Sequence, residues 1–386
     1  MINKKLKVGN VPNLRFPEFT EEWETKKLGE IATFSKGKGI SKSDIEENGI
    51  IECIRYGELY THYREVINKI KSKTNVNSST LVLSEKNDVI IPASGETTID
   101  IATASCVLKS GIALGGDLNI IKTNNNGIFL SYYLNSKKKM EIANLAQGIS
   151  VVHLYSSQLA SLSLSLPKLN EQNRISSFLA LIDERIQTQN KIIEQLETLI
   201  KGLSEKIYSH KIRFKKFTEK WEVKKLGEIS TITTGSSNRE DSILNGEYTF
   251  FDRSQDIRTS SRFLFDKEAV IVPGEGQEFI PKYFIGKFDL HQRTYAIFNF
   301  RGINGKYLYY HLLNDDKYLQ SQAVGSTVKS LRLPMFQSMP IKSPCLDEQT
   351  TIANFLSVIE TKIQTEKNIL DKYHCQKQYL LQSLFI

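Results

Sequence analysis

The chain has 386 residues, which predicts two to three domains at roughly 150 residues each, every one large enough for its own core. Hydrophobic residues make up 40% and charged residues 24%, the composition of a soluble globular protein, which excludes a disordered chain. The formal net charge of +8 permits an anionic partner without requiring one.

The sequence has no pattern typical of a membrane span, a secretory leader or a metal site. No apolar run approaches the roughly 18 residues that cross a bilayer, and no apolar stretch follows the N-terminal lysines. We therefore expect a cytoplasmic protein with no membrane partner. Cys53, Cys106, Cys345 and Cys375 are scattered, so we expect free thiols and neither a zinc site nor disulfides.

An internal repeat organises the chain. The segment from Phe19 to Ile31, with Trp23, returns 198 residues later from Phe217 to Ile229, with Trp221, and only two of the 13 positions differ. These are the only two tryptophans in the sequence. A second marker, Pro-x-Leu-x-Glu-Gln, begins at Pro167 and recurs 177 residues on at Pro344. The two markers predict two copies of one structural unit.

A long helix is predicted after each second marker, because apolar residues there alternate at four and three steps, which is a heptad seam. Each helix has about 35 residues and is roughly 50 Å long, so it needs a partner. We expect the two to pair antiparallel. Gln189 and Glu366 interrupt the two seams at the same place, where they either fix the register or reach solvent. The seam residues are Ile175, Leu179, Ile182, Ile186, Ile193 and Leu196 in the first helix, and Ile352, Leu356, Ile359, Ile363 and Leu370 in the second.

The segments between the markers are predicted to be two mixed strand and helix domains, which makes the fold class α+β. We expect a first domain at 14–165, a central helix at 166–211, a second domain at 212–342 and a C-terminal helix at 343–386. After their shared opening the two domains have little in common. Similar frames with different contents suggest two recognition modules that read different things.

A search for catalytic motifs returns only weak candidates. The chain has no phosphate-binding loop, its six histidines are isolated, and no proline follows Asn, Asp or Pro as in the adenine methyltransferase loop. Glu18 with Glu24-Thr25-Lys26 weakly imitates a metal-dependent nuclease, but the first acid becomes Lys216 in the second copy. We therefore expect no enzyme activity and favour a structural role for this segment.

A polyanion-binding surface is the remaining hypothesis. Guanidinium groups bridge guanine O6 and N7 or grip phosphate, and Ser, Thr and Gln also serve in base recognition. Two further stretches, near Gly148 and Gly325, match in pattern and are candidates for paired backbone contacts. The candidate DNA contacts are Lys36, Lys38, Lys42, Arg55 and Tyr56 in the first domain, and Arg239, Arg253, Ser254, Arg258, Arg262, Gln277, Arg293, Lys329 and Arg332 in the second.

The duplicated Trp-Glu-x-x-x-Leu-Gly-Glu-Ile openings at Trp23 and Trp221, with the motifs and helices at Pro167 and Pro344, resemble the specificity subunit of type I restriction-modification systems. The resemblance implies two target recognition domains that each read half of a split double-stranded DNA target, with the helices as spacer and docking platform. It also implies two modification subunits, which methylate adenine with S-adenosylmethionine, and restriction subunits, which use ATP and Mg. No cofactor is then expected on this chain itself.

Two alternatives remain open from the residues alone. A free-standing DNA-binding regulator, pseudo-dimeric within one chain, would bind its split site without a partner. A scaffold would use the same helices and domains to hold proteins, and its affinity for DNA would be weak and indifferent to sequence.

Overall fold

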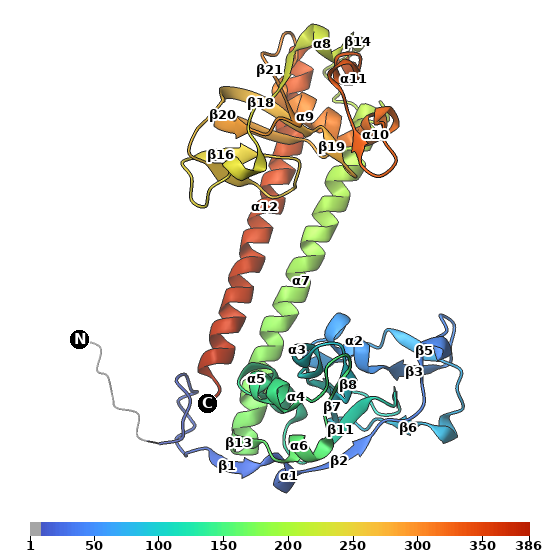
Figure 1. Cartoon of the computed structure of the whole chain (residues 1–386), viewed down its shortest axis with the longest axis vertical. Coiled ribbons are helices and arrows are strands. Elements are labelled where there is room, and N and C mark those ends of the chain that lie inside the picture. The colour runs from blue at the N-terminus through green and yellow to red at the C-terminus, as the bar shows by residue number, and fades with distance from the viewer. Residues whose placement is uncertain (1–8) are drawn as a thin grey trace, which may run out of the picture. The chain divides into compact units, whose positions relative to one another are not determined.

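The structure is a computed structural model that describes residues 9–386. The chain forms two compact units. Unit 1 comprises the chain up to Thr188 together with Leu370–Ile386, and unit 2 is Gln189–Ile369. The long helices α7 (Leu169–Tyr208) and α12 (Leu346–Ser383) each contribute one part to either unit (Figure 1).

Unit 1 contains a domain with two main sheets. A five-stranded sheet has the order β2-β11-β7-β9-β4, and a four-stranded sheet has the order β5-β3-β10-β6. The five-stranded sheet comprises β2 (Ala32–Lys36), β11 (Leu118–Thr123), β7 (Val89–Pro92), β9 (Ser105–Val107) and β4 (Val66–Ile67). The four-stranded sheet comprises β5 (Ser72–Thr74), β3 (Ile51–Ile54), β10 (Ala113–Leu114) and β6 (Val82–Leu83).

Short helices and two small strand pairs complete this domain. The helices are α1 (Leu28–Ile31), α2 (Tyr56–Thr61), α3 (Thr98–Ile101), α4 (Gly127–Ser136), α5 (Lys139–Leu145) and α6 (Ser156–Ala160), with 3-10 turns η1 (Lys42–Asp44) and η2 (Ser78–Thr80). The strand pairs are β1 (Glu24–Lys27) with β13 (Ser163–Leu166), and β8 (Ser94–Gly95) with β12 (Val152–His153).

Unit 2 contains a related domain in which one six-stranded sheet, of order β15-β21-β18-β20-β16-β17, replaces the two main sheets of unit 1. Its strands are β15 (Thr231–Thr234), β21 (Thr294–Phe298), β18 (Phe265–Pro273), β20 (Lys282–Leu290), β16 (Tyr248–Phe251) and β17 (Arg258–Ser260). The small pairs are β14 (Glu222–Lys225) with β23 (Pro340–Ser343), and β19 (Glu275–Gly276) with β22 (Lys329–Ser330). The helices are α8 (Leu226–Ile229), α9 (Gly305–Asn314), α10 (Asp316–Gln322) and α11 (Leu333–Gln337), with 3-10 turn η3 (Arg239–Asp241).

The repeated markers form the joint between each domain and the start of its long helix. At each joint an arginine makes a bidentate contact with the glutamate of the second marker. Arg15 donates to Glu171 from Nε and Nη2 at 2.7 Å each, and Arg213 donates to Glu348 at 2.7 and 2.6 Å. Gln172 Nε2 donates to Pro167 O at 2.8 Å, where it closes the turn into α7. In the same way, Gln349 closes the turn into α12. The Glu and Gln of the second marker therefore have a structural role: the Glu binds the arginine at the joint, and the Gln closes the turn into the long helix.

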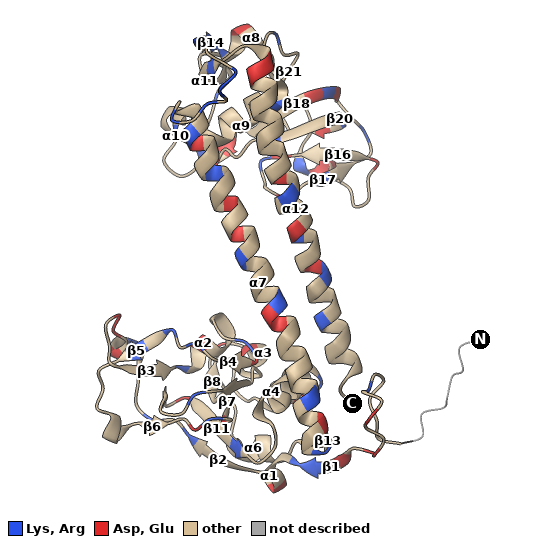
Figure 2. Cartoon of the chain, turned by 180° about the vertical axis from the view of Figure 1, so that it is seen from behind, with Lys and Arg blue, Asp and Glu red and all other residues tan. Residues whose placement is uncertain are grey.

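The seam residues are confirmed as the apolar face of the helices. Of the predicted positions, Leu196, Ile359 and Leu370 are half-buried, and the others are buried. Within unit 2, Gln189 Nε2 donates to Glu366 O at 3.1 Å and also to the Glu366 carboxylate, and both side chains are buried. The two interruptions therefore form a polar pair that sets the antiparallel register. Charged residues recur along both helices (Figure 2).

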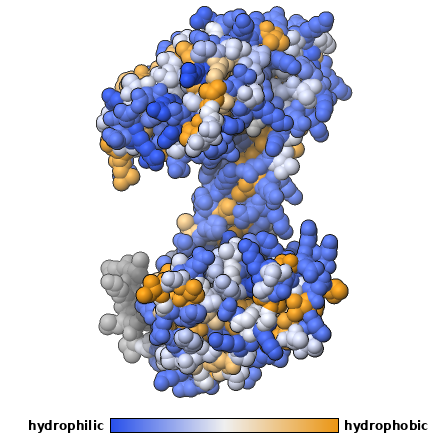
Figure 3. All heavy atoms as spheres, turned by 45° about the vertical axis from the view of Figure 1, so that its right-hand side comes forward, coloured by the Kyte–Doolittle hydropathy of each residue, from blue (hydrophilic) through white to orange (hydrophobic). Residues whose placement is uncertain are grey.

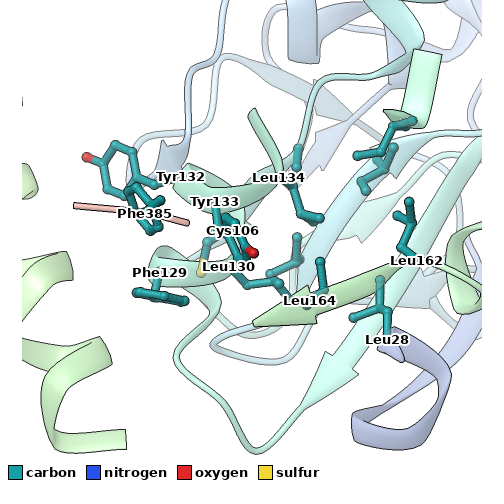
Figure 4. Packing of buried hydrophobic residues seen from close by; sticks show 14 of the residues in the cluster. Leu28, Cys106, Phe129, Leu130, Tyr132, Tyr133, Leu134, Leu162, Leu164 and Phe385 are labelled. Carbon is teal, nitrogen blue, oxygen red and sulfur yellow. The ribbon is translucent and has the colours of Figure 1, made fainter. Parts of the chain in front are cut away.

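Each core continues from the domain onto the helices. In unit 1 the ring of Phe385, past the end of α12, lies 5.5 Å from Tyr133 and 5.1 Å from Phe129, and all three are buried (Figure 4). In unit 2 Tyr208 of α7 takes the matching place, with its ring 5.2 Å from His311 and 5.5 Å from Tyr307. The predicted α+β class, with two related domains and an antiparallel helix pair, is confirmed.

Candidate nucleic-acid interface

The two domains share a backbone frame at the loops that carry the candidate DNA contacts. In each, the amide before a 3-10 turn donates to an aspartate at 2.7 Å, Ser41 to Asp44 and Asn238 to Asp241. The turns therefore place Lys42 of η1 and Arg239 of η3 at equivalent positions. Gly37 and Gly235 are also equivalent, because an added Cβ would lie 2.0 Å from Gly115 O and 1.7 Å from Leu290 O, respectively.

A second shared feature is a short hairpin beside β8 and β19. Gln147 and His153 exchange backbone hydrogen bonds of 2.9 and 2.7 Å, and Val324 and Ser330 exchange bonds of 3.0 and 2.8 Å. These hairpins include the two stretches near Gly148 and Gly325, whose proposed backbone contacts with DNA stay a prediction. The next residues correspond as well, because Leu154 N donates to Ala93 O and Leu331 N donates to Gly274 O.

Three of the predicted arginines in unit 2 meet at one pocket. Arg239, Arg253 and Arg293 line a pocket of about 300 Å³ with Asp252, His291 and Gln292. They come from η3, from the loop after β16 and from the loop between β20 and β21. Burial lowers the pKa of His291, so this ring is neutral at pH 7 and adds no further positive charge to the pocket.

One carboxylate holds two of these arginines together. Glu275 of β19 accepts from Arg293 Nη1 at 2.6 Å and from Arg253 Nη1 at 3.2 Å. Its side chain is 16% exposed, whereas those of Arg253 and Arg293 are 52% and 58% exposed. The guanidinium groups are therefore fixed on one side and open to solvent on the other.

Two further arginines of the set, Arg258 and Arg262, neutralise buried acids. Arg258 Nε lies 3.3 Å from Asp252, and Arg262 Nε lies 3.7 Å from the fully buried Asp289. Burial acts to raise the pKa of Asp252, but hydrogen bonds from the Ser254 hydroxyl and amide, with the charge of Arg258, lower it overall. The structural role of these contacts is to stabilise the buried acids below this surface. The sequence did not predict this role for Ser254, Arg258 and Arg262.

Gln277, Lys329 and Arg332 lie around the β19–β22 pair. Gln277 Nε2 donates to Thr327 O at 3.3 Å, and Lys329 Nζ donates to Gln320 at 3.2 Å. Arg332 is exposed at the residue before α11. Its equivalent before α6 is Tyr155, and Lys36 Nζ lies 5.9 Å from the centre of that ring.

The candidates of unit 1 divide into exposed lysines and a structural pair. Lys36, Lys38 and Lys42 are exposed. Arg55 is half-buried and pairs with the buried Glu58 at 3.3 Å, and Tyr56 packs against an apolar cluster formed by residues of both sheets. Arg55 is therefore already engaged in an ion pair within its own domain.

Glu275 and Asp252 are the residues that sequence reasoning passed over. An acid placed between arginines that come from separate loops is the signal that would have pointed to them.

The nuclease-like segment has a structural place. Glu24 and Lys26 form an exposed ion pair at 2.8 Å on β1, which pairs with β13, and Glu222 and Lys224 do the same on β14. Within residues 9–386 no group of three or more His, Cys, Asp or Glu side chains could hold a metal ion. The cysteines of that range are free. In the described part of the chain, no helix is both long and apolar enough to span a bilayer.

The two domains share one backbone frame but present different polar loops, and each packs against part of the long helices. This arrangement suits a protein that recognises two different targets. A family model for the type I restriction modification DNA specificity domain matches residues 20–198 and 218–372. The chain belongs to this family, and its role is in DNA specificity.

Individual relatives agree with this membership. A stretch of 152 residues, 39% of this chain, is 30% identical to the type I restriction enzyme EcoDI specificity subunit of Escherichia coli, and spans 34% of that protein. The MjaVIII specificity subunit of Methanocaldococcus jannaschii is 24% identical over 96% of this chain and 93% of its own length. The fold is similar to the S subunit of a type I restriction-modification system from M. genitalium, with a TM-score of 0.69 at 17% identity, covering 97% of this chain and 99% of the other.

Proposed function

We propose that the domains at 14–165 and 212–342 each bind one half of a split double-stranded DNA target, and that the chain thereby directs the chemistry of partner subunits. The observation that carries the proposal is the contrast within a shared frame. Lys42 and Arg239 occupy equivalent loop positions with the same charge, whereas Tyr155 and Arg332 differ. Common charge serves common phosphate binding, and the differing side chains serve sequence.

Phosphate and base contacts have separate roles in this proposal. Exposed lysines such as Lys36, Lys38 and Lys42 neutralise phosphates and give salt-dependent affinity. A few groups per domain reach base edges in the major groove and supply the sequence preference. Arg253 and Arg293, which line one pocket with Arg239, are the strongest candidates for base contacts in the second domain.

The outer faces of the two long helices are the docking sites that we propose for two modification subunits, one per unit. Leu181 of α7 is 57% exposed, and Val358, its equivalent on α12, is 70% exposed. Beside them, Phe178 contacts Phe16 at a ring distance of 5.7 Å, and Phe355 contacts Phe214 at 5.6 Å. Figure 3 shows a mostly hydrophilic face with apolar groups among the hydrophilic ones. A duplicated apolar patch on a charged helix favours two copies of one partner protein.

The proposed stoichiometry has a direct test. Leu181→Glu and Val358→Glu each place a charge on one patch, so each single variant is expected to bind one modification subunit and the double variant none. Native mass spectrometry of the co-purified complex gives the count. Lys191→Glu, a charge change on an exposed helix face, is the control. Retention of two subunits by the double variant would contradict this docking surface.

The reactions themselves belong, in this proposal, to the partners. The modification subunits supply S-adenosylmethionine and methylate adenine, and the restriction subunits supply the ATP- and Mg-dependent translocation and cleavage. This chain then holds no cofactor, has no catalytic activity of its own and works in the cytoplasm, where the DNA is.

The function is tested by co-expression with the modification subunit in a host that lacks adenine methylation. Mapping of modified adenines by single-molecule sequencing is expected to find one split motif. Modification without a motif, or no modification by an intact purified complex, would contradict the specificity role. Tight binding of a split site by this chain alone, with no effect of the modification subunit, would instead identify a free-standing regulator.

A further inference from the structure

The Glu275 carboxylate and its two arginines form a preorganised fork on the surface of the second domain. The contacts described above use Nη1 of Arg253 and Nη1 of Arg293, one on each carboxylate oxygen. The Nε–Nη2 edge of each guanidinium is not used in these contacts. That edge carries the two parallel N–H donors that guanine O6 and N7 accept.

The Glu275 carboxylate offsets one of the two arginine charges in the fork. Two guanidinium groups and one carboxylate sum to a single positive charge, and the carboxylate lies within 2.6 and 3.2 Å of the two cations. Glu275 therefore weakens the attraction of the fork for a phosphate, while the N–H donors that a neutral acceptor edge requires stay available. Arg239, in the same pocket and outside this fork, remains for the DNA backbone.

The first domain has a different chemistry at the equivalent positions. Glu275 corresponds to Ser94, because both follow the same strand and pair with the same hairpin. Arg293 corresponds to Asp117, because Ala93 N donates to Asp117 O at 2.8 Å and Gly274 N donates to Arg293 O at 2.9 Å. A carboxylate only accepts hydrogen bonds from a base, and a guanidinium only donates them.

We infer that Arg253 and Arg293 read guanine in the half-site bound by the second domain, and that Glu275 is the positioning residue that fixes them for it. Asp117 gives the first domain an acceptor at the matching place, suited to the amino groups of cytosine or adenine. The inference rests on the proposed function and adds the base class that one domain selects and the group that orients its readers.

The test uses the full chain in complex with its modification subunits, and a randomised DNA duplex library as the probe. The wild-type complex is expected to select a split motif with guanine at one or two neighbouring positions in one half. Arg293→Lys keeps the charge but loses the planar fork, so the preference for guanine at one position is expected to fall roughly tenfold or more. Its affinity for random duplex is expected to stay within about twofold, because phosphate binding depends mainly on charge.

The Glu275→Gln variant separates positioning from a merely structural role. Removal of a negative charge is expected to strengthen binding to random duplex, while the loss of the anchor relaxes the guanine preference in the same half-site. Asp117→Asn is the matched control in the first domain and is expected to alter only the other half. Thermal unfolding of each variant checks that the fold is kept.

The outcomes distinguish this inference from the proposed function. A wild-type split motif without guanine in the half that Arg293→Lys affects, or variants that leave every guanine position unchanged, would overturn the inference and leave the function standing. A variant that unfolds early is replaced by Arg253→Lys, for which the same two results decide. A wild-type complex that selects no motif at all would overturn both.

Discussion

Single residues settle how each long helix is held against its domain. In unit 1 Lys377 of α12 pairs with Asp183 of α7 at 2.8 Å and with Glu65 at 3.1 Å, and its ammonium lies 5.3 Å from the centre of the Tyr132 ring. Tyr132 in turn donates to Asp183. In unit 2 the place of Lys377 is taken by Ile200, while Glu360 accepts from Tyr309 and Tyr310. Both copies therefore use a tyrosine that donates to an acid of the long helix, and only unit 1 adds a lysine to this contact.

Lys377→Met is expected to destabilise unit 1 by about 3 kcal/mol, because it leaves two largely buried carboxylates without their cation. Lys367→Met breaks an exposed pair with Glu197 and should change stability by less than about 1 kcal/mol. Urea unfolding of the two variants beside the wild type measures both effects. Equal, small losses would show that the Lys377 network contributes little.

The pKa of His311 predicts an acid-sensitive point in unit 2. Burial, with a smaller contribution from the charge of Lys342, lowers the pKa of His311 to about 4. Its ring lies among Tyr208 and Tyr307, and its equivalent in unit 1 is Tyr133. Because the folded form binds the proton less readily than the unfolded form, the stability it contributes is complete above about pH 6.5 and falls as the pH drops toward 4.

His311→Phe is therefore expected to remove part of the acid sensitivity of the protein. Between pH 7 and pH 4 the wild type should lose roughly 3 kcal/mol more than the variant. The measurement is urea unfolding at both pH values, and the difference between the two proteins cancels the other titrating groups. Parallel losses for wild type and variant would mean that His311 does not control this sensitivity.

At the scale of elements, the long helices were the most predictable part of the fold. The spacing of apolar residues in a heptad seam predicts which face of the helix is buried. The seam residues from Ile175 to Ile186 and from Ile352 to Ile363 could therefore be identified from spacing alone. Gln189 and Glu366 were also located, but only their contact decides that they fix the register.

The partners of polar residues were beyond prediction. Lys377 and Glu65 are 312 residues apart in the sequence, and no local sequence pattern predicts a contact between residues so far apart. The same holds for the loops in unit 2, where residue type pointed to Arg253 and Arg293 but not to the Glu275 that joins them. The sequence shows which side chains are charged, but tertiary packing decides which of them form ion pairs within the protein.

The helix lengths are expected to set the gap between the half-sites. Seven-residue insertions after Leu199 and after Lys377 would separate Gln189 from Glu366 and Lys377 from Asp183. Insertions between Thr188 and Gln189, and between Ile369 and Leu370, keep each pair within its own unit.

Such a double insertion adds about 10 Å to the helix pair, which corresponds to roughly three base pairs. The split motif of the longer protein, read by methylation mapping, is expected to keep both halves and to gain unread bases between them. A single insertion in α7 alone serves as the control, because it breaks the register. An unchanged gap in the double-insertion protein would refute the spacer role.

At the scale of the whole molecule, the chain is one frame used twice. The joints Arg15–Glu171 and Arg213–Glu348 are the same, the caps of the recognition loops are the same, and the side chains that those loops present differ. Duplication of the supporting residues with divergence of the presented ones is what independent reading of two half-sites requires.

The most direct measurement is therefore an exchange of one domain. Residues 14–165 are replaced by the matching domain of another member of the family, and modified adenines are mapped in cells that also express the modification subunit. The expected result is a split motif in which one half is new, while the other half and the gap are those of the unaltered protein. A motif changed in both halves would contradict independent reading by the two domains.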